Sequence, residues 1–458
     1  MDRENFMSDH DQTASGNKMG SMPVPQLLLN MSIPLMVSLI FQSLYNIVDS
    51  IFVAMISENA LTATSLAYPV QILMVAVSVG TASGVSALLS RQLGMQRYDD
   101  AHSAATTGLI LSILSSFVFI VLGFFAVEAY VGLFTQDPET ASMCTAYLRI
   151  CMMFCTGTFL EVIGQRLLQA VGNTFLSMVS LIFSAGTNIV LDPILIFGLF
   201  GFPALGIRGA AIATVIGQWV GGFVALLLNK LYNKEIHFVF RGFRMNAQTI
   251  GTIYQVGIPT MVMQAMSSIM NAAMNGILIS FSSTAVAFFG VYYKLQNFLF
   301  MPMNGLGQAV MPIVGFNYGC HNKERLSRVL KTAVPAACVI GLTGTAVFSV
   351  IPGLLLSLFS ASDDMLSIGI PALRIISVTF AFGSATTVLG YYASGLGNGL
   401  VNMLGTSIRQ FIVLIPAAFL LARTAGIGSV WYAFWISETT AVICAAALFS
   451  RVYRRAMR

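Results

Sequence analysis

Apolar residues fill most of this chain in long runs, and short polar segments separate those runs. A transmembrane helix needs about 20 mainly apolar residues to cross a hydrocarbon core about 30 Å thick. Twelve runs reach that length, which predicts an all-α integral membrane protein with twelve transmembrane helices. The predicted spans are approximately 25–53, 61–90, 103–126, 141–168, 173–200, 206–231, 249–280, 284–315, 329–358, 364–393, 397–423 and 427–451.

The composition agrees with this pattern. Of 458 residues, 56% are hydrophobic and 9% are charged, whereas roughly 25% of residues are charged in soluble domains. The lipid bilayer is therefore the expected partner, and no nucleic-acid partner is expected. The six cysteines and four histidines have no metal-ligand spacing, so the sequence predicts neither a metal site nor a cofactor. All four histidines lie outside the predicted spans, which excludes a histidine proton relay within the membrane.

The distribution of basic residues predicts the orientation. Lys and Arg are enriched in short cytoplasmic loops of membrane proteins. Here they collect after spans two, six and eight and at the end of the chain, so both termini should be cytoplasmic in the cell membrane. We therefore expect a cytoplasmic tail at 1–24, a cytoplasmic linker at 232–248 and a basic tail at 452–458.

The sequence repeats itself after 225 residues. The shift places Pro34 on Pro259, Asn46 on Asn271, and Arg149 on Arg374. Each copy holds six spans, an even number, so the two copies enter the membrane in the same direction. The repeat predicts two six-helix bundles, 25–231 and 249–451, around a central cleft.

Rocking two such bundles would expose a central cleft to each side of the membrane in turn, which favours a transporter. A duplicated scaffold without transport and a channel are the alternatives. A channel needs rings of selectivity groups, which the sequence does not show. An intramembrane enzyme would need a nucleophile with its base or a metal cluster, and neither is apparent.

Carboxylates inside the predicted spans are expected to have a function or a specific partner, because inserting each one at a helix centre costs about 2.5–3.5 kcal/mol on insertion scales. The repeat partner of Asp49 is Met274 and that of Asp192 is Ala417, so the shared scaffold does not require these acids. The asymmetry indicates a function in the first bundle. The four candidate acids are Asp49, Glu161, Asp192 and Glu438.

Two amides share helix faces with these acids. Asn188 precedes Asp192 by four residues, and Gln42 precedes Asp49 by seven. Such groups can bind a coupling ion, or they can form a hydrogen-bond network that only fixes helix packing. Glu161 can contact substrate or pair with nearby Arg166.

Other polar and adaptable side chains allow two interpretations each. Glu438 can be the packing partner of a buried arginine, while Arg409 and Lys294 stay ambiguous. Met270 and Met274 can form an adaptable surface for varied hydrophobic compounds, or they can pack against neighbouring helices.

Two segments resemble the multidrug and toxic compound extrusion (MATE) family. One covers residues 49–102, and the other reads NIVLDPILIFGLFGFPALGIRGAAIATVIGQ over residues 188–218. The turn at Gly172 and Asn173 matches as well, and the resemblance spans nearly the whole chain. The acids of the first bundle look like the DinF-like branch, and the sequence is similar to bacterial MepA-type multidrug exporters. It departs from the NorM-like branch, which has acids in spans seven and ten.

The resemblance implies export of bulky amphipathic drugs and lipophilic cations in exchange for H⁺ or Na⁺, by a protein that we expect to be monomeric. The family's cation site maps onto Gln42, Asp49, Asn188, Asp192 and Thr214, and sodium would use Asp49, Asn188 and Asp192. Substrate contacts are expected at Glu161, Met270 and Met274.

A related class, the flippases for lipid-linked sugars, is the alternative that the resemblance leaves open. Such proteins tend to line the cleft with basic residues for phosphates. The acids of the first bundle favour cations instead. The basic residues that keep the flippase alternative open are Arg149, Lys294, Arg374 and Arg409.

Overall fold

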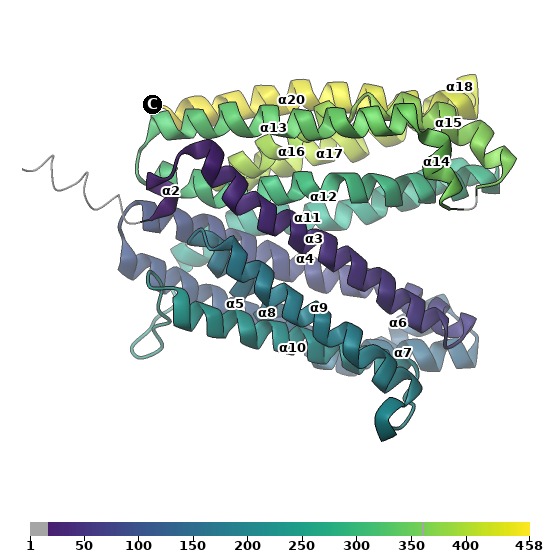
Figure 1. Cartoon of the computed structure of the whole chain (residues 1–458), viewed down its shortest axis with the longest axis horizontal. Coiled ribbons are helices and arrows are strands. Elements are labelled where there is room, and N and C mark those ends of the chain that lie inside the picture. Colours follow the sequence, from purple (N-terminus) through teal and green to yellow (C-terminus); the bar gives the residue numbers. More distant parts are fainter. Residues whose placement is uncertain (1–16, 360) are drawn as a thin grey trace, which may run out of the picture. The chain divides into compact units, whose positions relative to one another are not determined.

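The computed structural model describes residues 17–359 and 361–458, and helices account for nearly all of them (Figure 1). Ten helices are long and apolar enough to cross a membrane, and two bent helix pairs raise the number to as many as 12. This confirms the predicted all-α membrane fold. Of the predicted tail at 1–24, residues 1–16 lie outside the described residues.

By internal packing the chain divides into two compact units. Unit 1 contains Asn17 and Val37–Met261, and unit 2 contains Lys18–Met36 and Val262–Arg458. The predicted bundles were 25–231 and 249–451. The units differ from them because the first half of one long helix groups with unit 2, and the first half of its repeat partner groups with unit 1.

The helices of unit 1 follow one another through short loops. In chain order the elements are α3 (Val24–Ala54), α4 (Glu58–Gly94), α5 (Tyr98–Phe125), α6 (Val127–Phe134), α7 (Pro138–Met153), α8 (Thr156–Ala170), α9 (Thr174–Phe197), the 3₁₀ turn η1 (Leu199–Gly201), α10 (Ile207–Tyr232) and α11 (Ala247–Ile279). The first and last of these helices, α3 and α11, are shared between the two units.

Unit 2 repeats the order of long helices seen in unit 1. It also contains one π-helical segment, η2. Its further elements are α2 (Lys18–Ser21), α12 (Ser283–Gly319), α13 (Lys323–Val350), α14 (Pro352–Ser357), α15 (Asp363–Ser377), α16 (Phe380–Gly395), α17 (Gly399–Ser407), η2 (Ile408–Leu414), α18 (Ile415–Ala425), α19 (Ile427–Val430) and α20 (Tyr432–Ala456).

The sequence repeat is reproduced in local geometry. The Ser57 hydroxyl caps the start of α4 by accepting from the Ala60 amide at 3.0 Å. Its repeat partner Ser282 caps α12 in the same way, at 3.1 Å from the Ala285 amide. A serine cap satisfies an amide that the first turn of a helix leaves without an internal partner.

Two turns carry the repeat in their backbone as well. Gln96 has a φ of 59° and its repeat partner His321 has a φ of 55°. Residues other than glycine rarely adopt this left-handed region. Gly172 and Gly397 have φ of 89° and 84° at the turns before α9 and α17. Glycine reaches these angles without steric cost.

The fourth span of each repeat is broken, which the sequence did not predict. The expected spans 141–168 and 364–393 are the pairs α7–α8, bent by 48°, and α15–α16, bent by 50°. At the breaks, the amides of Cys155 and Thr379 donate to carbonyls three residues earlier, those of Met152 and Ile376. This is the tighter hydrogen-bond pattern of a 3₁₀ turn. Small or hydroxyl-bearing residues stand at both breaks, Cys155, Thr156 and Gly157 at the first and Ser377 and Thr379 at the second, and neither bend contains a proline.

Candidate functional site

Two glycines of α10 set the geometry of a polar cluster in unit 1. A Cβ on Gly217 would lie 2.8 Å from the Ser184 carbonyl oxygen, and one on Gly221 would lie 2.7 Å from the Ser184 Cβ. The Gly221 Cβ would also lie 2.8 Å from the Glu161 carboxyl. Only glycine lets α10 approach α8 and α9 so closely, because it has no side chain at the contact.

Asn188 links α9 to α10 at this contact. Its amide nitrogen lies 3.4 Å from Asp192 Oδ1 and 3.4 Å from the Thr214 hydroxyl. With the amide rotated, the nitrogen donates to Asp192 Oδ2 at 3.3 Å and the oxygen accepts from the Thr214 backbone amide at 3.2 Å. The second arrangement satisfies both ends of the amide. Asp192 is fully buried, and Asn188 is 3% exposed.

Asp49 completes the cluster from α3. Its carboxyl group lies within hydrogen-bonding reach of the Asp192 carboxyl. Asp49 Oδ1 is buried and has no hydrogen-bond partner in the part of the chain that the structure describes. Four of the five residues predicted for ion coupling therefore lie together, namely Asp49, Asn188, Asp192 and Thr214. The fifth, Gln42, is half-buried on α3.

Glu161 on α8 lies at the same glycine contact. It is 8% exposed, and its Oε1 accepts from the Gln165 side-chain amide at 3.2 Å. The neighbouring Arg166 donates to Gln169 Oε1 at 2.9 Å. The ion pair that the sequence allowed between Glu161 and Arg166 is not among the ion pairs of residues 17–359 and 361–458.

Sequence reasoning missed Tyr45, which lies close enough to Glu161, Asp49 and Asp192 to interact electrostatically with all three carboxyls. It stands four residues before Asp49, so helical spacing could have placed both side chains on one face. Ser184 was also missed. It lies against Gly221 beside Glu161. A serine in an apolar run gives no signal of its own.

The two methionines expected at the substrate site are buried in unit 2. Met270 is 6% exposed and Met274 is fully buried, in a core cluster with Phe288, Tyr292 and Trp431. Phe288 meets Trp431 edge to face, with ring centroids 5.0 Å apart. In this structure both methionines pack, which is the other interpretation that the sequence allowed. Their role in substrate binding stays a prediction.

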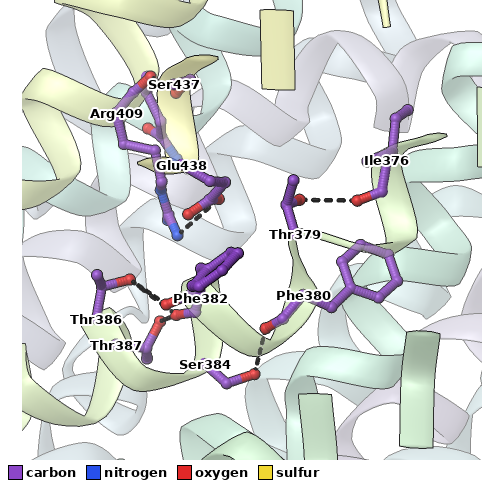
Figure 2. Close-up of polar contacts among 12 residues, drawn as sticks. Ile376, Thr379, Phe380, Phe382, Ser384, Thr386, Thr387, Arg409, Ser437 and Glu438 are labelled. Atoms are coloured by element: carbon purple, nitrogen blue, oxygen red, sulfur yellow. Dashed lines mark hydrogen bonds and ion pairs between the residues drawn. The ribbon is translucent and has the colours of Figure 1, made fainter. Parts of the chain in front are cut away.

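Glu438 has the arginine partner that its burial required. Arg409 Nη1 lies 3.5 Å from Glu438 Oε1 (Figure 2). Arg149, which the repeat shares with Arg374, pairs with Glu128 at 2.7 Å near the surface. Among the described residues, no group of three or more His, Cys, Asp or Glu side chains is placed to hold a metal ion.

Comparison with known protein families finds the same repeat in the chain. The sequence pattern that defines the MatE family occurs twice, over residues 34–194 and 259–420. The chain belongs to the MatE family. The two matches begin 225 residues apart, at the same shift as the repeated prolines, serine caps and turns. Members of this family are transporters and not enzymes, and they need no cofactor.

Relatives within the family resemble the chain over almost its whole length. The multidrug export protein MepA of Staphylococcus haemolyticus is 24% identical over 429 residues, which are 93% of this chain and 92% of that protein. MepA of Staphylococcus aureus strain MRSA252 is 24% identical over 435 residues, 94% of each chain.

Solved structures confirm the fold. An outward-facing multidrug resistance MATE transporter matches with a TM-score of 0.89 and 24% identity, covering 97% of this chain and 98% of the other. A transporter of Pyrococcus furiosus, described as having a binding pocket of reverse polarity, matches with a TM-score of 0.88 and 23% identity over 98% of both chains.

Proposed function

We propose that this MatE protein is a secondary active multidrug exporter that expels amphipathic, often cationic compounds in exchange for H⁺ or Na⁺. The observation that carries the proposal is the contact between the Asp49 and Asp192 carboxyls in unit 1. Two carboxylates in contact repel each other unless a proton or a cation lies between them. The pair is therefore suited to take up an ion on one side of the membrane and release it on the other.

The surroundings of the pair support either ion. The fully buried Asp192 has the Asn188 amide as a neighbour, and Asn188 in turn reaches Thr214 on α10. A proton on one carboxyl would be held by the other as a hydrogen bond. A sodium ion would instead use the clustered carboxylate, amide and hydroxyl oxygens, which are hard ligands of the kind such ions prefer.

The substrate class rests on the relatives and on charge. The relatives named above are multidrug export proteins. Tyr45 interacts electrostatically with Glu161 as well as with Asp49 and Asp192. Glu161 is therefore a third acid of the cluster. An acidic cluster raises the local concentration of cations. In this proposal the protein works by alternating access as a monomer in the cell membrane, with both termini cytoplasmic.

The pairing of basic residues supports the exporter over the lipid-linked sugar flippase. A flippase of this kind would offer free cationic groups to phosphates. Arg149 is paired with Glu128 at 2.7 Å, and Arg409 has Glu438 as its neighbour at 3.5 Å. Two of the four basic residues named for that alternative thus already have carboxylate partners.

The test is drug export in proteoliposomes under an imposed proton or sodium gradient, with a fluorescent cationic dye as substrate. Asp49→Asn and Asp192→Asn keep size and hydrogen bonding but remove the charge, so gradient-driven export should fall to background. Asp364→Asn, a matched change at an exposed position of α15, should export normally. Normal export by both Asn variants would mean that the carboxyl pair only fixes helix packing.

The same liposomes separate the exporter from the flippase. Dye flux that responds to the gradient supports the proposal. Translocation of a lipid-linked sugar without any dye flux would replace it with the alternative.

A further inference from the structure

Unit 2 contains a buried carboxylate that the coupling proposal does not use. Glu438 on α20 is 8% exposed. Its Oε2 is buried, and within the described residues no group donates a hydrogen bond to it. Leaving a buried charged oxygen without a donor is costly, and the cost falls when a ligand supplies the missing partner. Glu438 therefore has an open position for a positively charged group.

Its contact with Arg409 is long for an ion pair with a buried member. The Arg409–Glu438 distance is 3.5 Å through one nitrogen, longer than Arg149–Glu128 at 2.7 Å and Arg328–Glu324 at 2.6 Å; only the exposed pair Arg97–Asp100, at 3.9 Å, is longer among the described residues. Charge-assisted hydrogen bonds are usually about 2.7–2.9 Å long. The Arg409 side chain is 23% exposed against 11% for Glu438, so the arginine is the more accessible member of the pair.

The backbone at Arg409 is joined to α20 independently of the ion pair. Arg409 lies in the π-helix η2, and its carbonyl oxygen accepts a hydrogen bond from the Ser437 hydroxyl (Figure 2). π-Helical segments occur frequently at functional sites. Because the Ser437 bond holds the backbone, the guanidinium can leave Glu438 without separating η2 from α20.

Gly383 on α16 packs against the carboxylate. A Cβ at this position would lie 3.4 Å from both Glu438 carboxylate oxygens, so glycine leaves a space of about one methyl group beside them. Phe382, the preceding residue, is 46% exposed. An exposed aromatic ring one residue from this glycine can offer its face to an organic cation. Figure 2 shows this segment of α16 with the Arg409–Glu438 pair.

From these features we infer that Glu438 binds the cationic centre of the transported compound and that Arg409 occupies its place when no compound is bound. The inference rests on the proposed function, because it assumes that organic cations are substrates. The ligand class is a lipophilic cation with aromatic groups. The positive charge of the ligand replaces the guanidinium, so the buried carboxylate keeps a counter-charge in both states.

The test is equilibrium binding of radiolabelled tetraphenylphosphonium to the purified full-length protein, without any ion gradient. Glu438→Gln should raise the Kd about tenfold or more, because a buried charge partner is lost. Arg409→Gln removes the competing cation, so its Kd should fall or stay unchanged. The double variant should resemble Glu438→Gln. If the pair is only structural, both single variants weaken binding alike, and that result overturns the inference.

A glycine variant covers the case in which the charge variants fold poorly. Gly383→Ala keeps both charges and narrows the space beside the carboxylate, so it should weaken tetraphenylphosphonium binding. Gly290→Ala on α12 is the matched control, because no atom lies within 4 Å of its added Cβ. Equal binding by both glycine variants would contradict the inference.

The outcomes also separate this inference from the proposed function. If the wild-type protein binds tetraphenylphosphonium and Glu438→Gln binds it equally well, only the role of Glu438 is wrong. If the wild-type protein neither binds nor exports the cation, the proposed substrate class fails together with this site.

Discussion

The glycine contact in unit 1 gives a quantitative prediction for Gly221→Ala. The added Cβ would lie 2.7 Å from the Ser184 Cβ and 2.8 Å from both Cδ and Oε1 of Glu161. The Glu161 carboxyl can rotate away, but the Ser184 Cβ is fixed to the backbone of α9. Helix α10 must therefore move, and overpacking of this kind typically costs about 1–3 kcal/mol.

Alanine also has a favourable effect that a control must remove. Replacing glycine in a helix interior by alanine stabilises the helix by roughly 0.5–1 kcal/mol. Gly186→Ala on α9 isolates this gain, because its Cβ would meet no atom within 4 Å and the residue is exposed. We expect the two variants to differ by about 1–3 kcal/mol in the free energy of unfolding, with Gly221→Ala the less stable.

Unfolding of the purified protein in mixed detergent and SDS micelles measures this difference, and dye export in liposomes measures its effect on function. Because Glu161 must also move, Gly221→Ala should alter the apparent affinity for the dye, while Gly186→Ala should not. Equal stabilities for the two variants would show that α8, α9 and α10 do not pack as closely as described, and the acidic cluster built on that contact would be refuted.

Further predictions concern positions outside the membrane core. Ser57→Ala and Ser282→Ala each remove a helix cap, so each should lower the free energy of unfolding by about 1 kcal/mol, and an effect of only one would contradict the structural repeat. Burial raises the pKa of Glu235 above its ordinary value of 4.5, and the hydrogen bond from the Asn17 amide partly opposes this shift. The protonated Glu235 side chain therefore contributes stability that is fully present below pH 4.5 and is lost as the pH rises through the pKa of the folded state. Glu235→Gln should therefore be more stable than wild type at pH 7 and equal to it near pH 4, as thermal melts in detergent would show. Arg325→Ala removes one of two side-chain donors to the Met19 carbonyl, together with the donor to the Met22 carbonyl, and should speed proteolysis near residue 20.

Much of the fold could be predicted because a transmembrane helix requires a run of about 20 mainly apolar residues, which is visible in the sequence. Ten of the spans appear as continuous helical segments, since each is a long apolar run that can be recognised without tertiary information. The two broken spans could not be predicted. Their bends come from one turn of tighter hydrogen bonds at Cys155 and Thr379. The Ser and Thr residues beside these turns do not mark a bend, because such residues also occur within unbroken transmembrane helices. The sequence repeat predicts only that a bend in one copy has an equivalent bend in the other copy.

The candidate site divides in the same way. Helical spacing places Asn188 with Asp192, since both are on one helix and one turn apart. No spacing rule connects Asp49 on α3 with Asp192 on α9, or Asn188 with Thr214 on α10, because these meetings depend on tertiary packing. Thr214 was predicted for the cation site from the resemblance to a known family, because its neighbours in the sequence give no sign of such a role.

The division of α3 and α11 between the two units has a consequence for what one copy of the repeat can form by itself. Unit 2 takes Lys18–Met36 from the first repeat, and unit 1 takes the start of α11 up to Met261 from the second. Met36 and Met261 are 225 residues apart, so the two exchanges are equivalent. Each copy lends the opening half of its first helix to the other. A single copy cut at the repeat boundary would therefore lack the helix segment that completes its own compact unit.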